Sequence, residues 1–162
     1  GVGKTTLAKV VAKKVKEEKL FDQVVMVTIS QNPNVKDIQG QMADSLGLKF
    51  EEEMEEGRAK QLFLLLKEKR KILIILDDIW ATLNLTTIGI PFGDDFKGCA
   101  ILLTTRQHDV CINMRCELEI RLGILNEEEG MTLFRKHTGI NDDSPNFNDV
   151  AKEVVRECEA FR

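Results

Sequence analysis

The residues at the start of the chain constrain its fold more than any others. Gly1 to Thr6 read Gly-Val-Gly-Lys-Thr-Thr, and Gly3, Lys4 and Thr5 match the last three positions of the phosphate-binding pattern G-x-x-x-x-G-K-S/T. In this pattern the N–H groups of a loop and of the following helix surround phosphate oxygens, because the helix dipole favours an anion there. The sequence therefore predicts a nucleotide site at a helix N-terminus.

Each residue of the motif has an expected role. The backbone that lines the phosphates belongs to Gly1, Val2, Gly3, Lys4, Thr5 and Thr6. Lys4 is expected to reach the β- and γ-phosphates, and the Thr5 hydroxyl to ligate Mg²⁺. The first glycine of the pattern and the strand expected before it are not in the sequence. We therefore expect a fragment that alone aggregates and binds nucleotide poorly, since a missing strand leaves backbone groups unpaired.

The composition narrows the class of protein. A hydrophobic content of 43% with 31% charged residues is typical of a globular domain, and 162 residues allow one domain or one domain plus the start of another. The net charge of -4 argues against a nucleic-acid partner, and no apolar run is long enough to predict a membrane segment. Four cysteines without C-x-x-C spacing predict no zinc site. We expect reduced thiols and a cytoplasmic location, with membrane association of a longer parent left open.

Hydrophobic periodicity predicts alternating strands and helices. Strands are expected at 24–29, 72–76 and 100–103, with a weaker one at 117–122, and helices at 5–19, 35–46, 51–69, 127–137 and 147–157. This order predicts an α/β P-loop NTPase, a parallel sheet flanked by helices that lacks its central P-loop strand. We expect residues 1–125 to form the nucleotide-binding core and 126–162 to begin a helical subdomain. The loop 139–145, which is rich in residues that break helices and strands, is a candidate subdomain junction.

Polar residues follow two of the apolar strands, at the sheet edge where ligands bind in such folds. Asp77 is expected to hold Mg²⁺, and Asp78 to orient or deprotonate an attacking water. Arg106 is expected to read the terminal phosphate and to assist catalysis. The alternatives are a simple strand cap for the two aspartates and a surface ion pair for Arg106. We expect Trp80 to be a packing residue without a direct role in the chemistry.

Two further residue types carry no predicted function. Thr104 and Thr105 are interpreted as an extension of the β-branched strand. His108 and His137 have no partner spacing, so both are interpreted as structural.

These residues together resemble the NB-ARC family, the nucleotide-binding domain of plant disease-resistance proteins with leucine-rich repeats. The blocks that carry the resemblance are Gly1 to Thr6, Phe21 to Ser30 with Asn34, Val35, Ile38 and Gln39, Lys71 to Trp80, Gly98 to Arg106, and Leu122 to Phe134. Trp80 is the form typical of members with a coiled-coil amino terminus. The chain departs from the pattern at Ala160 to Arg162, where the family usually has Gly-Leu-Pro-Leu.

The resemblance implies a molecular switch. Such a receptor binds ADP at rest, exchanges it for ATP when a pathogen is perceived, then oligomerises and signals defence. Its ATPase activity is at most slow and Mg²⁺-dependent. By the same resemblance Lys4 and Thr5 bind phosphate and Mg²⁺, Asp77 holds the metal, Asp78 is the catalytic carboxylate and Arg106 the phosphate sensor. The expected intramolecular partners are a coiled coil, a winged helix and leucine-rich repeats.

Three other classes of function stay open at this point. A kinase or metabolic ATPase would turn over continuously, but the sequence offers no second substrate site. A GTPase would carry the guanine-reading pattern N-K-x-D, which the sequence lacks. An interaction module with a vestigial P-loop would not retain ADP.

Overall fold

Hydrophobic strands and amphipathic helices alternate along the computed structural model, which describes residues 2–93, 98–139 and 149–155. The elements are α1 (Lys4–Glu17), β1 (Gln23–Thr28), α2 (Val35–Leu46), α3 (Glu55–Glu68), β2 (Ile72–Ile79), α4 (Leu85–Ile88), β3 (Cys99–Thr105), α5 (His108–Asn113) and α6 (Glu127–Thr138). Residues 149–155 are also helical. They divide into a unit of Lys4–Glu119 and a second unit of Gly1–Gly3 with Ile120–Arg162.

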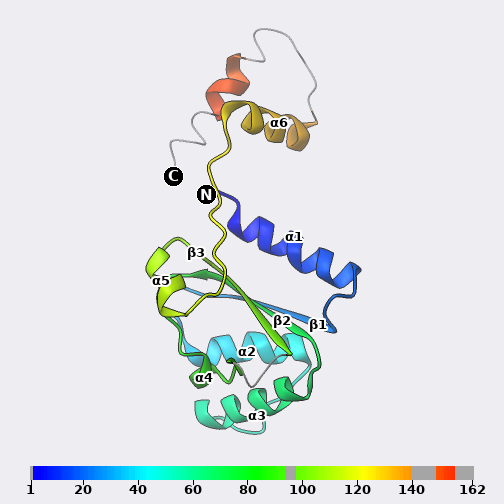
Figure 1. Cartoon of the computed structure of the whole chain (residues 1–162), viewed down its shortest axis with the longest axis vertical. Coiled ribbons are helices and arrows are strands. Elements are labelled where there is room, and N and C mark those ends of the chain that lie inside the picture. Colours follow the sequence, from blue (N-terminus) through cyan, green and yellow to red (C-terminus); the bar gives the residue numbers. More distant parts are fainter. Residues whose placement is uncertain (1, 94–97, 140–148, 156–162) are drawn as a thin grey trace. The chain divides into compact units, whose positions relative to one another are not determined.

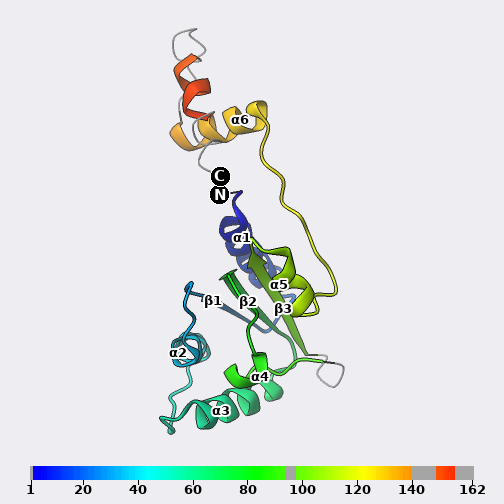
Figure 2. The ribbon, with the colours of Figure 1, turned by 90° about the vertical axis from the view of Figure 1, so that its left-hand side faces the viewer.

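The unit Lys4–Glu119 is built on a parallel sheet. Within the described residues the sheet has the order β1-β2-β3, with Val25 opposite Ile74 and Ile74 opposite Ile101. The helix α1 covers one face of this sheet, and α2, α3 and α4 cover the other (Figure 1, Figure 2). The prediction of an α/β fold with a parallel sheet flanked by helices is therefore confirmed.

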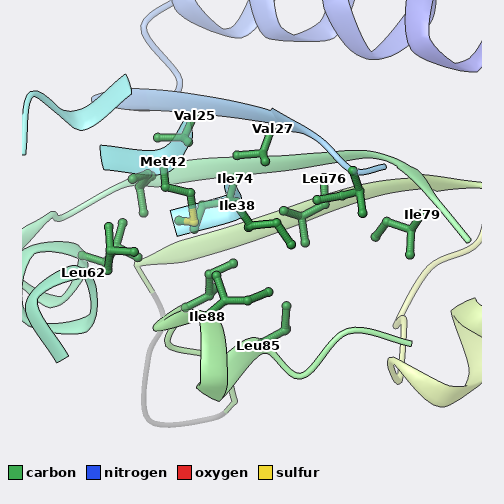
Figure 3. Close-up of a cluster of buried hydrophobic side chains, with 14 of the residues drawn as sticks. Val25, Val27, Ile38, Met42, Leu62, Ile74, Leu76, Ile79, Leu85 and Ile88 are labelled. Atoms are coloured by element: carbon green, nitrogen blue, oxygen red, sulfur yellow. The ribbon is translucent and has the colours of Figure 1, made fainter. Parts of the chain in front are cut away.

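Both faces of the sheet are apolar, because the strands are apolar at successive positions and successive residues point to opposite sides. The larger buried cluster lies between the sheet and the helices α2, α3 and α4 (Figure 3). Its members include Val25, Val27, Ile38, Met42, Leu62, Ile74, Leu76, Ile79, Leu85 and Ile88. The smaller cluster lies under α1 and contains Ala8, Val24, Leu73 and Ile75. The central strand β2 contributes to both, so it anchors the core.

The helix α2 has the boundaries that the sequence predicts. The Asn34 side chain accepts hydrogen bonds from the backbone N–H groups of Lys36 and Asp37, which have no partner inside the helix. Gly47 ends the helix with φ +68°, a left-handed conformation that glycine adopts without strain. The chain then turns toward α3.

The helix α3 starts later than predicted, at Glu55 and not at Glu51. The preceding residues fold back along the helix, because the Glu51 N–H donates to the Gln61 side chain and Arg58 donates to the Glu52 carbonyl oxygen. The acidic stretch thus gives only its last two glutamates to the first turn of the helix.

The predicted strand at 117–122 is wrong. These residues have no regular secondary structure, and among the described strands none pairs with them. Leu118 and Ile120 are 77% and 72% exposed, so their alternation does not place them against a core. The short helices α4 and α5 were not predicted, because neither is long enough to show a helical period.

The second unit contains the helix α6, whose boundaries agree with the predicted helix at 127–137. Asn126 and Glu129 form a capping box, in which each side chain bonds the backbone N–H of the other residue. The predicted helix at 147–157 is helical over 149–155, and its ends lie outside the described residues, as do 140–145 of the predicted loop. Within the described part, no helix is long and apolar enough to cross a membrane.

Candidate nucleotide site

Asp77 lies at the centre of a polar cluster at the carboxyl end of the sheet. It is 1% exposed, although it ends an aliphatic run. Its Oδ1 atom accepts a hydrogen bond from Thr5 Oγ1 at 3.1 Å and another from Thr104 Oγ1 at 2.6 Å. The structure thus brings together Thr5 and Asp77, the two residues that the sequence predicts as magnesium ligands, although they are far apart in the chain.

The oxygen atoms of Thr5 and Asp77 suit a magnesium ion. Mg²⁺ prefers hard oxygen ligands and usually binds one or two protein groups while it keeps several waters. The described residues hold no cluster of three or more His, Cys, Asp or Glu side chains, which a metal site built only from protein ligands would need. One hydroxyl and one carboxylate therefore fit a cation whose other ligands are water and phosphate.

Thr104 links the ends of β2 and β3. Its hydroxyl donates to Asp77 Oδ1 and accepts the backbone N–H of Asp78 at 2.9 Å. The sequence did not predict this role, and Thr104 was interpreted as a strand residue only. The contact depends on the register of the two strands, which hydrophobic periodicity does not specify.

Asp78 has an unusual backbone conformation. Its φ is +61°, in the left-handed region that few residues other than glycine adopt. The register between β2 and β3 shifts between Leu76 and Ile79, so the strand bulges at the two aspartates. The bulge leaves Asp77 buried and the Asp78 side chain partly exposed.

Trp80 and Arg106 both lie beside Asp78. The Trp80 indole N–H donates to Asp78 Oδ2 at 3.1 Å, and Arg106 Nε lies 3.9 Å from Asp78 Oδ1. The Arg106 guanidinium also lies over the Trp80 ring, 5.4 Å from its centroid. The interpretation of Trp80 as a packing residue is therefore incomplete, because its indole contacts both residues predicted to be catalytic.

The motif residues are described in part. Gly1 lies outside the described residues, and Gly3 has φ +81°, which suits a tight turn before a helix. Lys4 opens α1, and the described residues give its ammonium group no acceptor. Val2 is half-buried, whereas Thr6 is exposed on the first turn of α1.

The two histidines take no part in this cluster. His108 Nδ1 lies 3.0 Å from a Glu119 carboxylate oxygen, in a partly exposed pair. His137 lies in the last turn of α6.

A family model places the chain among known proteins. Residues 1–144 match the model of the NB-ARC domain. The chain belongs to the NB-ARC family. The predicted resemblance is therefore confirmed over most of the chain.

The chain is similar to plant disease resistance proteins. It is 36% identical to disease resistance protein At4g27190 of Arabidopsis thaliana over 98% of this chain and 16% of that protein. It is 34% identical to disease resistance protein RPS5 of the same plant, again over 98% of this chain and over 18% of that protein. The chain thus spans less than a fifth of the length of these relatives.

A solved structure shares the fold. The ORC2 protein of Aeropyrum pernix superposes with a TM-score of 0.62 at 23% identity, over 86% of this chain and 43% of that one. This likeness concerns the fold, and together with the family match it agrees with the predicted α/β fold class.

Proposed function

We propose that this NB-ARC domain is the ADP/ATP-binding switch of a plant intracellular immune receptor, with ADP bound at rest and ATP bound during defence signalling. The contact between the Thr5 hydroxyl and the buried Asp77 carboxylate is the observation that carries this proposal. It joins a phosphate-binding helix to the carboxyl end of β2, as Mg²⁺-nucleotide binding requires. The similarity to disease resistance proteins supports the immune role.

The residues would divide the work of binding. The motif backbone and the Lys4 ammonium group hold the phosphates, while Thr5 and Asp77 hold Mg²⁺. When bound, the ion neutralises charge on the β- and γ-phosphates. Thr104 keeps the Asp77 carboxylate oriented through its short hydrogen bond. The ORC2 structure of the same fold was solved in complexes with ADPNP and ADP, which supports an adenine nucleotide here.

Arg106 and Asp78 would act on the terminal phosphate. Arg106 follows β3 directly and its side chain is 60% exposed, so its guanidinium can turn toward a γ-phosphate, which is present in ATP and absent in ADP. Asp78 would accept a proton from the attacking water. Hydrolysis would be slow and would reset the switch.

The remaining predictions belong to the same proposal. Residues 1–125 would form the nucleotide-binding core and 126–162 the start of a helical subdomain. The other domains of the receptor would be a coiled coil, a winged helix and leucine-rich repeats, and ATP binding would lead to oligomerisation. The protein would act in the cytoplasm, in a parent that is able to associate with membranes.

The test is ADP binding by isothermal titration calorimetry on the full-length protein, with Lys4→Ala compared with Lys9→Ala. Lys9 is an exposed lysine of the same helix, so it controls for helix propensity and charge. We expect Lys4→Ala to weaken ADP binding by about 100-fold, because a charge-assisted contact to phosphate is lost, and Lys9→Ala to leave it unchanged. Equal effects of the two variants would overturn the assignment.

An ATPase or kinase with continuous metabolic turnover is the alternative. The measurement that separates the two is the steady-state rate of phosphate release at saturating ATP. A switch is expected to turn over at about one per minute or slower, far below typical metabolic enzymes.

A further inference from the structure

The Asp78 carboxylate is contacted at both of its oxygen atoms. Oδ2 accepts the indole N–H of Trp80 at 3.1 Å, and Oδ1 faces Arg106 Nε at 3.9 Å. A carboxylate without a hydrogen-bond partner can rotate about its terminal torsion, which has broad preferences. Contacts at both oxygens therefore restrict the direction in which Asp78 presents its lone pairs.

The backbone around Trp80 is itself fixed. Ile79 is 2% exposed, and its carbonyl oxygen accepts a hydrogen bond from Thr105 Oγ1 at 2.7 Å. The same threonine hydroxyl accepts the Gln107 N–H at 3.0 Å. One hydroxyl thus ties the segment that leads to Trp80 to the segment that carries Arg106.

Tryptophan combines the two groups that this cluster uses. Its ring edge carries an N–H donor, which reaches Asp78, and its ring face attracts a cation, which is Arg106 here. Phenylalanine would keep the face and lose the donor. A leucine would lose both.

We propose that Trp80 is a positioning residue of the nucleotide site, whose indole N–H orients the Asp78 carboxylate and whose ring seats the Arg106 guanidinium beside it. This inference rests on the proposed function, because it assigns a partner to the residues that would act on the terminal phosphate. It adds Trp80, which touches neither phosphate nor metal in this assignment.

The ion pair between Arg106 and Asp78 is accessible to solvent. The Arg106 side chain is 60% exposed and the Asp78 side chain is 39% exposed. An exposed pair at this separation is weak, so a γ-phosphate with several anionic oxygens competes with it for the guanidinium. When Arg106 leaves, the Trp80 N–H still holds Asp78 Oδ2, and Oδ1 is free to accept a proton from water. Trp80 thus keeps the carboxylate aligned while its charged neighbour moves.

The first test is the single-turnover rate of ATP hydrolysis by the full-length protein. We expect Trp80→Phe to lower the rate about tenfold and to leave the ADP dissociation constant within about threefold, because only Asp78 loses a contact. Trp80→His keeps a ring N–H and is expected to recover part of the rate. Phe63→Leu is the matched control, because Phe63 on α3 has a similar cation contact: the Lys67 ammonium lies 5.3 Å from the centroid of its ring.

A double-mutant cycle separates positioning from a general structural role. If Trp80 acts through Asp78, then adding Trp80→Phe to Asp78→Asn lowers the rate no further. Additive losses, or a tenfold loss in Phe63→Leu as well, would overturn the inference.

The second test does not depend on hydrolysis. Trp80 is the single tryptophan of the chain. In a longer form of the protein that has further tryptophans, the fluorescence of Trp80 is obtained as the difference between the wild type and Trp80→Phe. We expect Asp78→Asn and Arg106→Gln each to change this emission without nucleotide. We also expect a nonhydrolysable ATP analogue to change it more than ADP does, and Arg106→Gln to abolish that difference. If neither substitution changes the Trp80 fluorescence, the contacts of Trp80 with Asp78 and Arg106 do not form.

The two proposals fail in different ways. If the protein binds no adenine nucleotide and yet Trp80 emission responds to Asp78→Asn and Arg106→Gln, the proposed function is wrong and the cluster has another role. If ADP binding depends on Lys4 and Trp80→Phe changes neither rate nor emission response, the proposed function stands and the inference about Trp80 is wrong.

Discussion

The two halves of β2 differ in almost every physical property. The first half, Ile72 to Leu76, is between 0% and 6% exposed and pairs regularly with β1 and β3. The second half, from Asp77 to Ile79, contains two carboxylates, a shift in register and a residue at φ +61°. Buried apolar contacts stabilise a fold, whereas polar groups and left-handed backbone cost free energy. The first half therefore stabilises the fold, whereas the second half carries residues of the candidate nucleotide site.

The largest expected effect concerns the first half. We expect Ile74→Ala to lower the free energy of unfolding by about 2–5 kcal/mol, because it leaves a cavity in the central strand. Ile74 is 0% exposed and packs in the larger cluster (Figure 3). Chemical denaturation followed by circular dichroism measures the change.

Leu64→Ala is the matched control, since it removes the same number of carbon atoms at a side chain that is 54% exposed. It is expected to cost less than about 1 kcal/mol. At a temperature where Ile74→Ala remains folded, its ADP affinity should equal that of the parent. Weakened binding by the folded variant would break the division between the two halves.

The first half of β2 was predictable from the sequence, and the reason is physical. A strand buried on both faces must be apolar at every position, so Ile72 to Leu76 stands out as a run. The same logic found β1 and the middle of β3. It failed at 117–122, where alternating Leu118 and Ile120 meet no neighbouring strand among the described residues. Pairing depends on a partner, which local periodicity does not contain.

The second prediction concerns the hydroxyl that links the two aspartates. We expect Thr104→Val to lower the affinity for Mg²⁺-ADP about tenfold and the free energy of unfolding by about 1–3 kcal/mol, because the buried Asp77 loses a donor and the Asp78 N–H loses its acceptor. Calorimetry and denaturation measure the two effects. Valine has the shape of threonine, so packing is kept.

Thr104→Ser is the control for this substitution. It keeps the hydroxyl and removes only a methyl group, so most of the affinity should return. A serine variant as weak as the valine variant would show that the methyl group, and not the hydrogen bonds, is important.

The candidate site was predictable only in part. Lys4, Thr5, Asp77, Asp78 and Arg106 were proposed because each residue type has a known chemistry at a motif or strand end. Their roles in nucleotide binding stay predictions. Thr104 and Trp80 were missed because their contacts arise from the register of β3 and the bulge in β2. Such contacts require the three-dimensional structure.

The third prediction measures the backbone cost in the second half. Asp78→Gly and Asp78→Ala both remove the carboxylate, and they differ only in the Cβ atom. Because φ is +61° at this position, we expect the glycine variant to be about 1 kcal/mol more stable than the alanine variant. Denaturant midpoints of the two variants give the difference. Equal stability would mean that the left-handed conformation of residue 78 costs no free energy. The backbone would then not distinguish the two halves of β2.

The fourth prediction tests how well β3 covers the paired edge of the first half of β2. Cys99 pairs with Ile72 in the register of β2 and β3, and burial raises the pKa of its thiol from 9.0 to about 11. At pH 8 the reactive thiolate is therefore about 100-fold scarcer than for an ordinary thiol, and alkylation of Cys99 by iodoacetamide should be correspondingly slow. Mass spectrometry of the peptide that contains Cys99 measures the rate, with the protein in denaturant as the control.

The sign of the pH dependence follows from the same shift in pKa. The fold favours the neutral thiol, so this contribution to stability is complete below pH 9 and is lost as the pH rises through about 11. Cys99→Ala should remove this part of the alkaline destabilisation. Fast alkylation of Cys99 in the native protein at pH 8 would mean that the first half of β2 opens to solvent at its paired edge. The first half of β2 would then not be the closed, stabilising part of the strand.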